Sequence, residues 1–559
     1  MENRIKIVFY FSLLLFLAII LRLFSWQVTS SETLEGLSER QTLTTFSIPA
    51  KRGKIFASDG KPLVINQRAF LVYAEPNNIK DFEKTSQILA KDLDIPFASI
   101  SAKISDRSLA WVPLAHKVDE QIINKLKNKN LDGLGFLEES KRYYPEASMA
   151  AHILGFVGKN SKGEDQGYFG IEGYYNEQLK GRDGQIRKER DAQGNTILSG
   201  KITEIPAEDG RDLTLTIDKT VQYIAEKKLQ EGVEKYGAKG GTVLILEPFS
   251  GAVIAAVSLP AYDPQKYNNY SNEFYKNPSI ASTYEPGSTF KVLIMAAALN
   301  EGKINLDTKI EENGPIEIGG YKINTWNQKY HGIINPSQVL EYSSNVGMVI
   351  IEKLIGSDKL LNYLNDFGFG SLTGIDLQEE ASPNLRSKNK WYEIDFATVS
   401  FGQGIAVTPL QMVKAVSAIA NGGKIMKPYV VKKIKLPSGE LINIEPKVEK
   451  EIFSKETSRI VSEMMVSAVE NGETRFIEPL GYYIAGKTGT AQIPIKGHYD
   501  EDKTIASFIG FAPISKPRFV MLVTMREPTA SPWGSETAAP VFFNIAKELF
   551  TYYGISSSE

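Results

Sequence analysis

Cysteine is absent from all 559 residues, and histidine is nearly so. The first absence excludes disulfides, cysteine zinc sites, thiol nucleophiles and a lipid-modified cysteine anchor. No two of the four histidines are close in sequence, so few residues are available for a histidine metal cluster or a Ser-His-Asp triad. These histidines are His116, His152, His331 and His498.

A marked excess of either charge is also missing. The formal net charge is -2, so nothing points to nucleic acid as a partner. Hydrophobic residues make up 42% and charged residues 23%, which are ordinary values for globular protein. The chain has no internal repeat and no low-complexity run, and its length allows three or four domains.

Long hydrophobic runs are limited to one, Ile7 to Leu21 at the N-terminus. Fifteen helical residues span only about 22 Å, less than the roughly 30 Å hydrocarbon core of a bilayer. Lys6 and Arg22 can snorkel, and Trp26 suits the interface, which lengthens the effective span to about 20 residues. We therefore expect one transmembrane anchor within residues 1–28.

The charges before this run predict its orientation. Arg4 and Lys6 precede it, so the N-terminus should stay cytoplasmic and the bulk of the chain should lie outside the membrane. A cleaved signal peptide is the alternative, but the best small-residue site, Val28-Thr29-Ser30, fits the cleavage pattern poorly. Residues 29–45, which are polar and rich in Ser and Thr, are expected to form a juxtamembrane stalk.

Residues 46–220 are predicted to form a β-rich domain. Short apolar runs alternate with turns such as Asp59-Gly60, a typical hairpin signal. Two helices, Phe82–Leu93 and Asp119–Asn128, are inserted between strand-like pieces. Gln193-Gly194 is expected to be another turn, and residues 212–218 alternate like a strand.

Residues 221–554 are predicted to form a second domain, with 555–559 as a tail. It should begin with helix Thr220–Tyr236 and a hairpin of Gly241–Glu247 and Ala252–Val257. Strands are expected again near the end, before a last helix. Strands at both ends with helices between predict one antiparallel sheet flanked by helices, an α+β domain. The late elements are Tyr482–Ala485, Ala506–Phe511, Phe519–Met525 and the helix Ala538–Phe550.

Ser288 and Lys291 form the most informative local pattern. Residues three apart on a helix lie on one face, so an amine comes within reach of a hydroxyl. Ser288 follows Pro286-Gly287 and opens an apolar helix, where free backbone N–H groups could bind an oxyanion. Burial would lower the pKa of Lys291 and leave it able to accept a proton. Alone, the pattern is more typical of a helix cap and a snorkelling lysine.

Two further short patterns follow. Ser343-Ser344-Asn345 precedes an apolar helix, Val346–Leu354, and alone is typical of an N-cap. Lys487-Thr488-Gly489-Thr490 alone is typical of an exposed strand end. In a strand, Lys487 and Gly489 would face one way and Thr488 and Thr490 the other, and glycine would let another chain approach closely.

Together, S-x-x-K, S-x-N and K-T-G form the signature set of serine β-lactamases and penicillin-binding proteins. The chain resembles the class B penicillin-binding proteins, monofunctional transpeptidases of bacterial cell-wall synthesis, over roughly residues 45–545. Other matching blocks are Arg52-Gly53, Asp59-Gly60, Arg142-x-Tyr144-Pro145, Gly170-Ile171-Glu172, Leu215-Thr216-Ile217-Asp218 with Gln222, Tyr262-Asp263-Pro264, Ser400-Phe401-Gly402-Gln403-Gly404 and Thr408-Pro409-Leu410-Gln411.

The resemblance implies an elongated β-rich pedestal for dimerisation or interaction over residues 46–220, followed by a penicillin-binding transpeptidase domain. It implies peptide cross-linking through a serine acyl-enzyme with release of D-alanine, and no metal or cofactor. The ligands would be peptidoglycan stem peptides and β-lactams. Glycan polymerisation should be absent, because residues 46–220 do not resemble a glycosyltransferase.

The resemblance also implies residue roles. Ser288 would be the nucleophile and Lys291 its base. Ser343 would relay a proton under the influence of Lys487, and Asn345 would orient Lys291. Thr488, Gly489 and Thr490 would be the substrate-binding segment, in which the two threonine hydroxyls and the charge of Lys487 hold the terminal carboxylate. Backbone N–H groups of Ser288 and Thr490 would form the oxyanion hole.

Asn345 resembles the division-type (FtsI-like) branch, since the elongation-type branch usually carries aspartate there. The implied partners are a membrane-embedded, FtsW-like glycan polymerase and other division proteins. Alternatives are an elongation-type transpeptidase, a membrane-bound β-lactam sensor, a β-lactamase, a carboxypeptidase and a non-catalytic division scaffold. A sensor usually needs several membrane helices, a β-lactamase is about half this length, and a scaffold would not need the intact trio.

Overall fold

The structure, a computed structural model, describes residues 1–34, 43–109, 111–189, 202–477, 481–495 and 498–557. The chain divides into two units. The first consists of Met1–Arg52 with Lys180–Gly210, and the second of Gly53–Leu179 with Arg211–Glu559. Each unit is described below by itself.

The first unit contains the apolar helix. Helix α1 (Glu2–Phe24) continues as the π-helical segment η1 (Ser25–Thr29), and every residue of α1 is exposed. At 1.5 Å per residue these 28 residues extend over about 42 Å, more than the expected run alone would cover. The guanidinium of Arg22 lies 4.9 Å above the Trp26 ring, an arrangement suited to a membrane interface. Among the described residues this is the one helix long and apolar enough to cross a membrane.

The same unit holds a small antiparallel sheet. Its strands are β1 (Leu43–Ile48), β8 (Gly184–Glu189) and β9 (Ile202–Ile205), in the order β1-β8-β9. β1 therefore begins inside the segment expected to be a stalk. The turn expected at Gln193-Gly194 lies outside the described residues.

The second unit begins with a sheet built on the long strand β3. β3 (Pro62–Ala74) pairs with β2 (Ile55–Phe56), β4 (Val112–Asp119) and β5 (Leu134–Tyr143). Three helices bury their apolar residues against it, and two of them confirm the helices expected here. These are α3 (Phe82–Leu93), α4 (Phe97–Ser105) and α5 (Glu120–Lys127).

The β3 sheet continues into the C-terminal half of the chain. β2 pairs in parallel with β10 (Asp212–Leu215), and β10 pairs with β18 (Val431–Lys435), which pairs with β19 (Leu441–Asn443). A strand more than 200 residues away thus joins the N-terminal sheet. The sheet runs across the boundary expected at residue 220, so this part of the pedestal and the next domain share one hydrogen-bonded framework.

The following domain contains the predicted antiparallel sheet. Its strand order is β12-β11-β23-β22-β21, so strands from both ends of the domain lie side by side. The expected hairpin and the strand Phe519–Met525 are confirmed with shifts of one or two residues in their bounds. The strand expected at Ala506–Phe511 is present but begins eight residues earlier, and the strand expected at Tyr482–Ala485 is an exception. The strands are β11 (Gly240–Leu246), β12 (Val253–Leu259), β21 (Ala485–Ile495), β22 (His498–Ala512) and β23 (Phe519–Arg526).

The strand expected at Tyr482–Ala485 is wrong, because the observed strand is β21. It begins at Ala485 rather than ending there, so Lys487–Thr490 lies inside a strand and not at its end. The sequence of β21 is rich in glycine and polar residues and therefore has a weak strand signal. Pairing with β22, from Ala485 with Phe511 onward, gives it strand structure.

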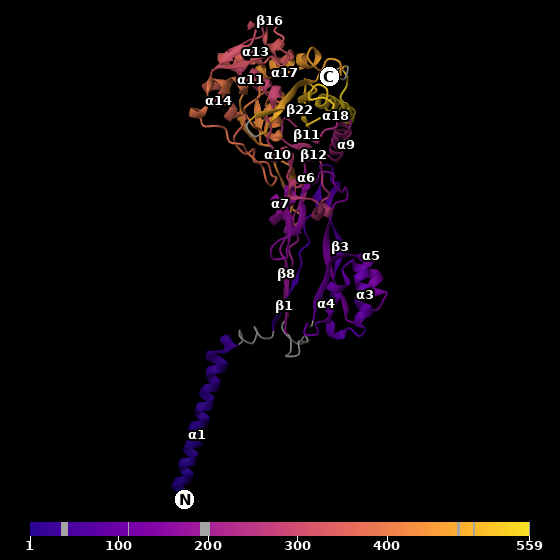
Figure 1. Ribbon diagram of the computed structural model, residues 1–559. Coiled ribbons are helices and arrows are strands. Elements are labelled where there is room, and N and C mark those ends of the chain that lie inside the picture. The colour runs from indigo at the N-terminus through magenta and orange to yellow at the C-terminus, as the bar shows by residue number, and fades with distance from the viewer. Residues whose placement is uncertain (35–42, 110, 190–201, 478–480, 496–497, 558–559) are drawn as a thin grey trace. The chain divides into compact units, whose positions relative to one another are not determined.

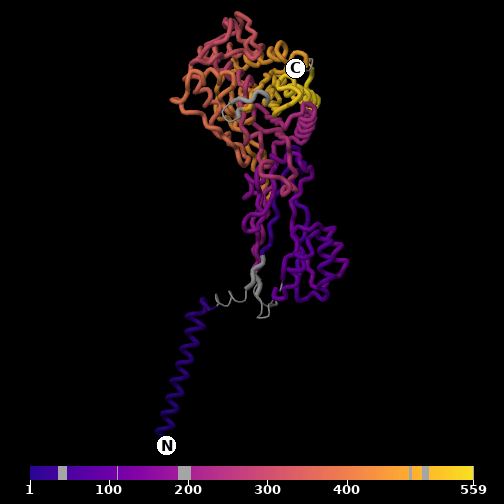
Figure 2. Tube along the Cα trace, in the orientation of Figure 1, coloured from indigo at the N-terminus to yellow at the C-terminus, as the bar shows by residue number. Residues whose placement is uncertain are grey.

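Helices cover both faces of this sheet. On one face α9 (Lys219–Tyr236) packs beside α18 (Ala538–Tyr553) in a second apolar cluster, although more than 300 residues separate them (Figures 1 and 2). Asp218 caps α9 by accepting hydrogen bonds from Thr220 N and Val221 N. The other face is covered by α16 (Pro409–Ala420) and α17 (Lys455–Glu470). α11 (Lys291–Asn300) packs on these two helices and α13 (Asn345–Ile355) packs on α11, all within the largest core.

Candidate active site

Ser288 lies on a 3₁₀ turn, η5 (Gly287–Phe290), that leads directly into α11. In a 3₁₀ turn residues i and i+3 are eclipsed, so Ser288 and Lys291 share one side. Gly287 has φ +55, and a Cβ on the neighbouring Gly402 would lie only 2.1 Å from the Gly287 carbonyl oxygen. The close approach of these two glycines fixes the turn, which agrees with the predicted helix start.

Lys291 is completely buried beneath this turn. Its Nζ donates to the Ser343 carbonyl oxygen at 2.5 Å and to Asn345 Oδ1 at 2.8 Å, and lies 3.3 Å from Ser343 Oγ. Burial, and then the positive charge of Lys487, lower the pKa of Lys291 well below its ordinary value, against the smaller effects of Glu473 and Glu312. The neutral amine is therefore favoured, as a general base requires.

The segment between α12 (Pro336–Glu341) and α13 brings Ser343 and Asn345 to this amine. Ser343 is buried and has φ +54, a conformation unusual for a residue other than glycine and often found at functional sites. Ser344 caps α13, as predicted, by accepting a hydrogen bond from Gly347 N. Asn345 Nδ2 donates to the Asn324 carbonyl oxygen, which turns Oδ1 toward Lys291.

These contacts suit an uncharged Lys291. A neutral amine has two N–H donors and one lone pair. The carbonyl oxygens of Ser343 and Asn345 can only accept, so they take both donors. The lone pair then remains for a hydroxyl proton, either from Ser343 or from Ser288.

β21 supplies the third group of residues. Lys487 Nζ lies 3.0 Å from Thr488 Oγ1, and Thr488 Oγ1 donates to Glu473 Oε2 at 2.8 Å. Lys487 is buried, and burial lowers its pKa while the Glu473 carboxylate raises it. Among the described residues, the hydrogen bonds of Lys487 Nζ go to Thr488, so the predicted influence on Ser343 would act through space or through Lys291.

Gly489 and Thr490 place β21 against the serine turn. A Cβ on Gly489 would lie 2.8 Å from Thr289 Cγ2 and 3.0 Å from the Pro286 carbonyl oxygen, which agrees with the predicted close approach. Thr490 Oγ1 accepts a hydrogen bond from Gly534 N.

A cavity of about 290 Å³ opens at Ser288. Ser288, Asn345 and Thr490 line it, while Lys291, Ser343 and Lys487 lie buried behind it. The remaining lining residues are Gly287, Trp326, Phe401, Gln403, Gln492, Thr504, Pro532 and Trp533. The predicted serine, asparagine and threonine therefore face one space that is open to a ligand.

Several residues of this site had no signal of their own in the sequence. Trp326 and Trp533 form a T-shaped ring pair, with centroids 5.3 Å apart, at the cavity wall. Glu312 is fully buried and accepts hydrogen bonds from Ser344 Oγ and His331 N. Glu473 contacts Thr488 from the turn after α17. Only their tertiary neighbours distinguish these residues from other tryptophans and glutamates.

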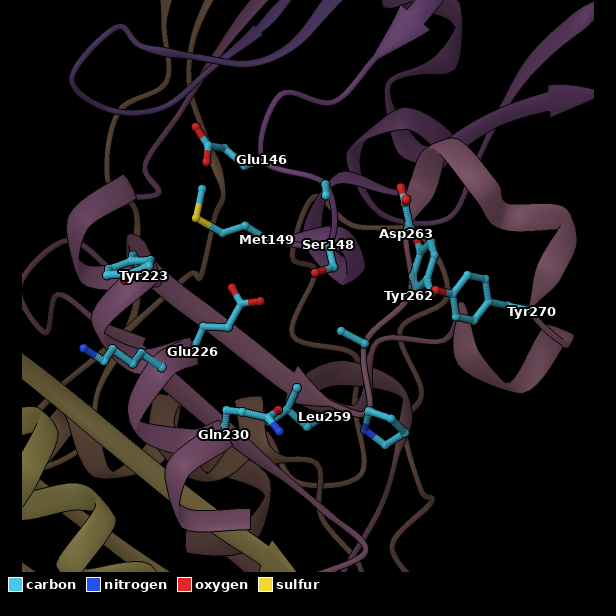
Figure 3. Close-up of a pocket in the computed structure, with 14 residues that line it drawn as sticks. Glu146, Ser148, Met149, Tyr223, Glu226, Gln230, Leu259, Tyr262, Asp263 and Tyr270 are labelled. Carbon is cyan, nitrogen blue, oxygen red and sulfur yellow. The ribbon is translucent and has the colours of Figure 1, made fainter. Parts of the chain in front are cut away.

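A larger cavity, of about 790 Å³, lies elsewhere, between α9 and the segments 146–149 and 259–263 (Figure 3). Its labelled side chains include Glu226, whose pKa is raised by burial, and Tyr223 and Met149 around it. None of the residues of the three motifs lines it. Size alone therefore does not select between the two cavities, and the smaller one is lined by Ser288, Asn345 and Thr490 of the three motifs.

Two family descriptions match most of the chain. Residues 241–547 match the penicillin binding protein transpeptidase domain, and residues 47–215 match the penicillin-binding protein dimerisation domain. The first range contains all three motifs.

Known proteins are similar over nearly the whole length. Stage V sporulation protein D of Bacillus subtilis is 34% identical, covering 99% of this chain and 86% of the relative. Peptidoglycan D,D-transpeptidase FtsI of Escherichia coli is 30% identical, covering 95% and 88%. The crystal structure of penicillin binding protein 2X from Streptococcus thermophilus superposes with a TM-score of 0.76 at 26% identity, covering 92% and 81%.

Proposed function

The chain belongs to the penicillin-binding proteins that carry a dimerisation domain and a transpeptidase domain, and we propose that Ser288 is its acylated nucleophile in peptidoglycan cross-linking. The observation that carries this proposal is the desolvated Lys291 amine. It lies beneath the Ser288 turn, with both of its donors satisfied by the carbonyl oxygens of Ser343 and Asn345.

In acylation, Ser288 Oγ attacks the carbonyl carbon of the penultimate D-alanine of a donor stem peptide. The hydroxyl proton passes to the lone pair of Lys291 Nζ. Ser343 Oγ, 3.3 Å from that nitrogen, relays a proton to the departing amine, the C–N bond breaks, and D-alanine leaves. Lys291 is best placed for this role because its pKa is lowered by burial and by Lys487.

The developing oxyanion is assigned to the backbone N–H groups of Ser288 and Thr490, each worth about 2.7–4 kcal/mol in related chemistry. In deacylation, a side-chain amine of a second stem peptide attacks the ester and its C–O bond breaks. The acceptor forms the cross-link, and Ser288 Oγ regains its proton. Water in place of the amine would make the enzyme a carboxypeptidase.

We assign the ligand carboxylate to the hydroxyl of Thr490, which lines the cavity, and to Thr488 and the charge of Lys487 beside it. A β-lactam carries a carboxylate and a strained amide in the same relative positions as the donor peptide. It should therefore acylate Ser288. Gly489 provides the close contact between β21 and the serine turn.

For the biological role we favour septal wall synthesis. Asn345, and the similarity to FtsI of Escherichia coli, support this assignment. The similarity to stage V sporulation protein D gives a second candidate, a role in sporulation. The apolar helix Glu2–Thr29 would anchor the protein with its N-terminus in the cytoplasm and the catalytic domain outside. An FtsW-like polymerase and other division proteins would be its partners.

The direct test is labelling with a fluorescent penicillin, comparing the wild type with Ser288→Ala and with a neutral control, Ser438→Ala, in the exposed turn before β19. We expect the wild type and the control to label covalently and Ser288→Ala not to label. Labelling of the Ser288 variant would show that another residue is the nucleophile. Localisation in growing cells tests the role, because a protein spread along the side wall and absent from septa would contradict a septal function.

A further inference from the structure

Glu473 is an exposed residue whose carboxylate contacts a buried part of the site. It lies in the turn that follows α17, and its Oε2 accepts the Thr488 hydroxyl proton at 2.8 Å. Thr488 Oγ1 in turn lies 3.0 Å from Lys487 Nζ. The three groups form a directed chain from ammonium to hydroxyl to carboxylate.

The turn that carries Glu473 is held in place by buried contacts. Thr474 is 1% exposed, and its Oγ1 donates to the Val469 carbonyl oxygen. A Cβ on Gly472 would lie 2.2 Å from the Ala468 carbonyl oxygen, so the backbone of the turn packs closely against the end of α17. The position of Glu473 is therefore a feature of the fold, although its side chain faces solvent.

The direction of the hydrogen bonds limits what Thr488 can do. A hydroxyl has one proton, and a carboxylate can only accept, so that proton points to Glu473. A second carboxylate cannot receive the same proton. Thr488 is only 6% exposed and does not line the Ser288 cavity, whereas Thr490 does. A ligand carboxylate that is to bind Thr488 must take the place of the Glu473 carboxylate.

We propose that Glu473 is the resident anion of the carboxylate subsite, and that the terminal carboxylate of a donor peptide or β-lactam replaces it at Thr488. This proposal rests on the proposed function of the same site. In the ligand-free enzyme Glu473 balances the charge of Lys487. When a ligand binds, its own carboxylate supplies that charge, and Glu473 turns into solvent. Glu473 is thus a positioning residue. Because of it, one carboxylate lies beside Lys487 whether or not a ligand is bound.

The charges around the lysine pair support this assignment. Among the described residues, Lys291 is influenced by Lys487, by Glu473 from the turn after α17 and by Glu312 on β13 (Ile310–Glu312). Lys487 is influenced by Glu473. Glu473 raises the pKa of both lysines, and among the residues that the structure describes it is the one side chain that opposes the effect of burial on the pKa of Lys487. Glu312 is fully buried and bound to Ser344 and His331, so it is not available for exchange.

The test compares Glu473→Gln with Glu470→Gln, which removes the same charge from an exposed position three residues away. The measurement is the second-order rate constant of acylation by benzylpenicillin between about pH 5 and 10. For Glu473→Gln we expect the plateau to rise about two- to fivefold, the range of an exposed ion pair. We also expect its alkaline limb to move to lower pH, because the Glu473 carboxylate raises the pKa of Lys487 and its removal takes that effect away. Glu470→Gln should leave both unchanged.

A second variant separates the two effects. Glu473→Asp keeps the charge but shortens the side chain by one methylene, so it should raise the plateau while the alkaline limb stays near that of the wild type. If the plateau and alkaline limb of Glu473→Gln match the wild type, the proposal is refuted. A reduced plateau with an unmoved limb also refutes it, since Glu473 would then only hold Thr488 in place. Failure of the wild type to acylate at Ser288 would instead refute the proposed function.

Discussion

Replacing Gly489 by alanine should move Ser288, the proposed nucleophile, without changing any side chain proposed for catalysis. The added Cβ would lie 2.5 Å from Ser507 Oγ, 2.8 Å from Thr289 Cγ2 and 3.0 Å from the Pro286 carbonyl oxygen. Real Cβ contacts of this kind are essentially never shorter than 3.0 Å. The Ser507 hydroxyl can rotate away, but Pro286 and Thr289 belong to the segment that carries Ser288. The turn must therefore shift away from β21.

The expected magnitudes follow from this geometry. Inserting one methyl group into a packed site typically costs about 1–3 kcal/mol. A shift of the serine turn by a few tenths of an ångström misaligns Ser288 with the proposed oxyanion donor on β21, the backbone N–H of Thr490. Because a misplacement of about 1 Å can cost roughly 100-fold in rate, we expect acylation to fall by about 10- to 100-fold.

The assay is stopped-flow acylation by a fluorescent penicillin, with the melting temperature measured in parallel. Gly314→Ala is the matched control, because its added Cβ has no atom within 4 Å and its φ is ordinary. The control should acylate like the wild type. If Gly489→Ala acylates and melts like the control, the packing of the serine turn on β21 does not position Ser288.

Three further predictions concern charge and burial. Lys291→Arg keeps a permanent cation at the base, so acylation should be lost at every pH in stopped-flow measurements; a pH-dependent residual rate would contradict the role of a neutral amine. Burial lowers the pKa of His152 to about 4. Between about pH 4 and 6.5 the unfolded state therefore binds more protons than the folded state, and the free energy of unfolding rises with pH. Acidification through that window should lower the free energy of unfolding by about 3 kcal/mol. Urea unfolding at several pH values checks this, and in His152→Gln the free energy of unfolding should depend less on pH over this range. The buried Arg142 guanidinium lies 2.6 Å from the Glu172 carboxylate, and Glu172→Gln removes that negative charge. Calorimetry should show that the free energy of unfolding falls by about 3–5 kcal/mol. The control Arg68→Ala, which breaks an exposed ion pair, should lower it by less than about 1 kcal/mol.

Local patterns identified the elements whose signals are continuous in sequence. Helix Phe82–Leu93 was predicted with the bounds of α3, and helix Thr220–Tyr236 differs from α9 by one residue. Periodicity and capping groups, such as Asp218 before α9, act within one or two turns, so a single segment contains the information. The hairpin of β11 and β12 was found for the same reason.

Pairing between distant segments was not visible in this way. β21 was placed too early and too short, because its glycines and polar residues become a strand only beside β22. The pairing of β10 with β18 joins residues more than 200 positions apart, and neither strand carries a mark of its partner. Register across a sheet depends on which faces are buried together, which a linear pattern does not specify.

Residue types, spacing and the resemblance to class B penicillin-binding proteins were enough to name the candidate site residues: Ser288, Lys291, Ser343, Asn345 and the Lys487–Thr490 segment. The burial and the protonation of these groups depend on the tertiary structure. Complete burial and the approach of Lys487 lower the pKa of the Lys291 amine and so favour its neutral form, and the Glu473 turn gives Thr488 a carboxylate partner. Residue identity fixes which protons a side chain can exchange, whereas desolvation and neighbouring charge, which arise only when distant segments pack together, set which protons it holds.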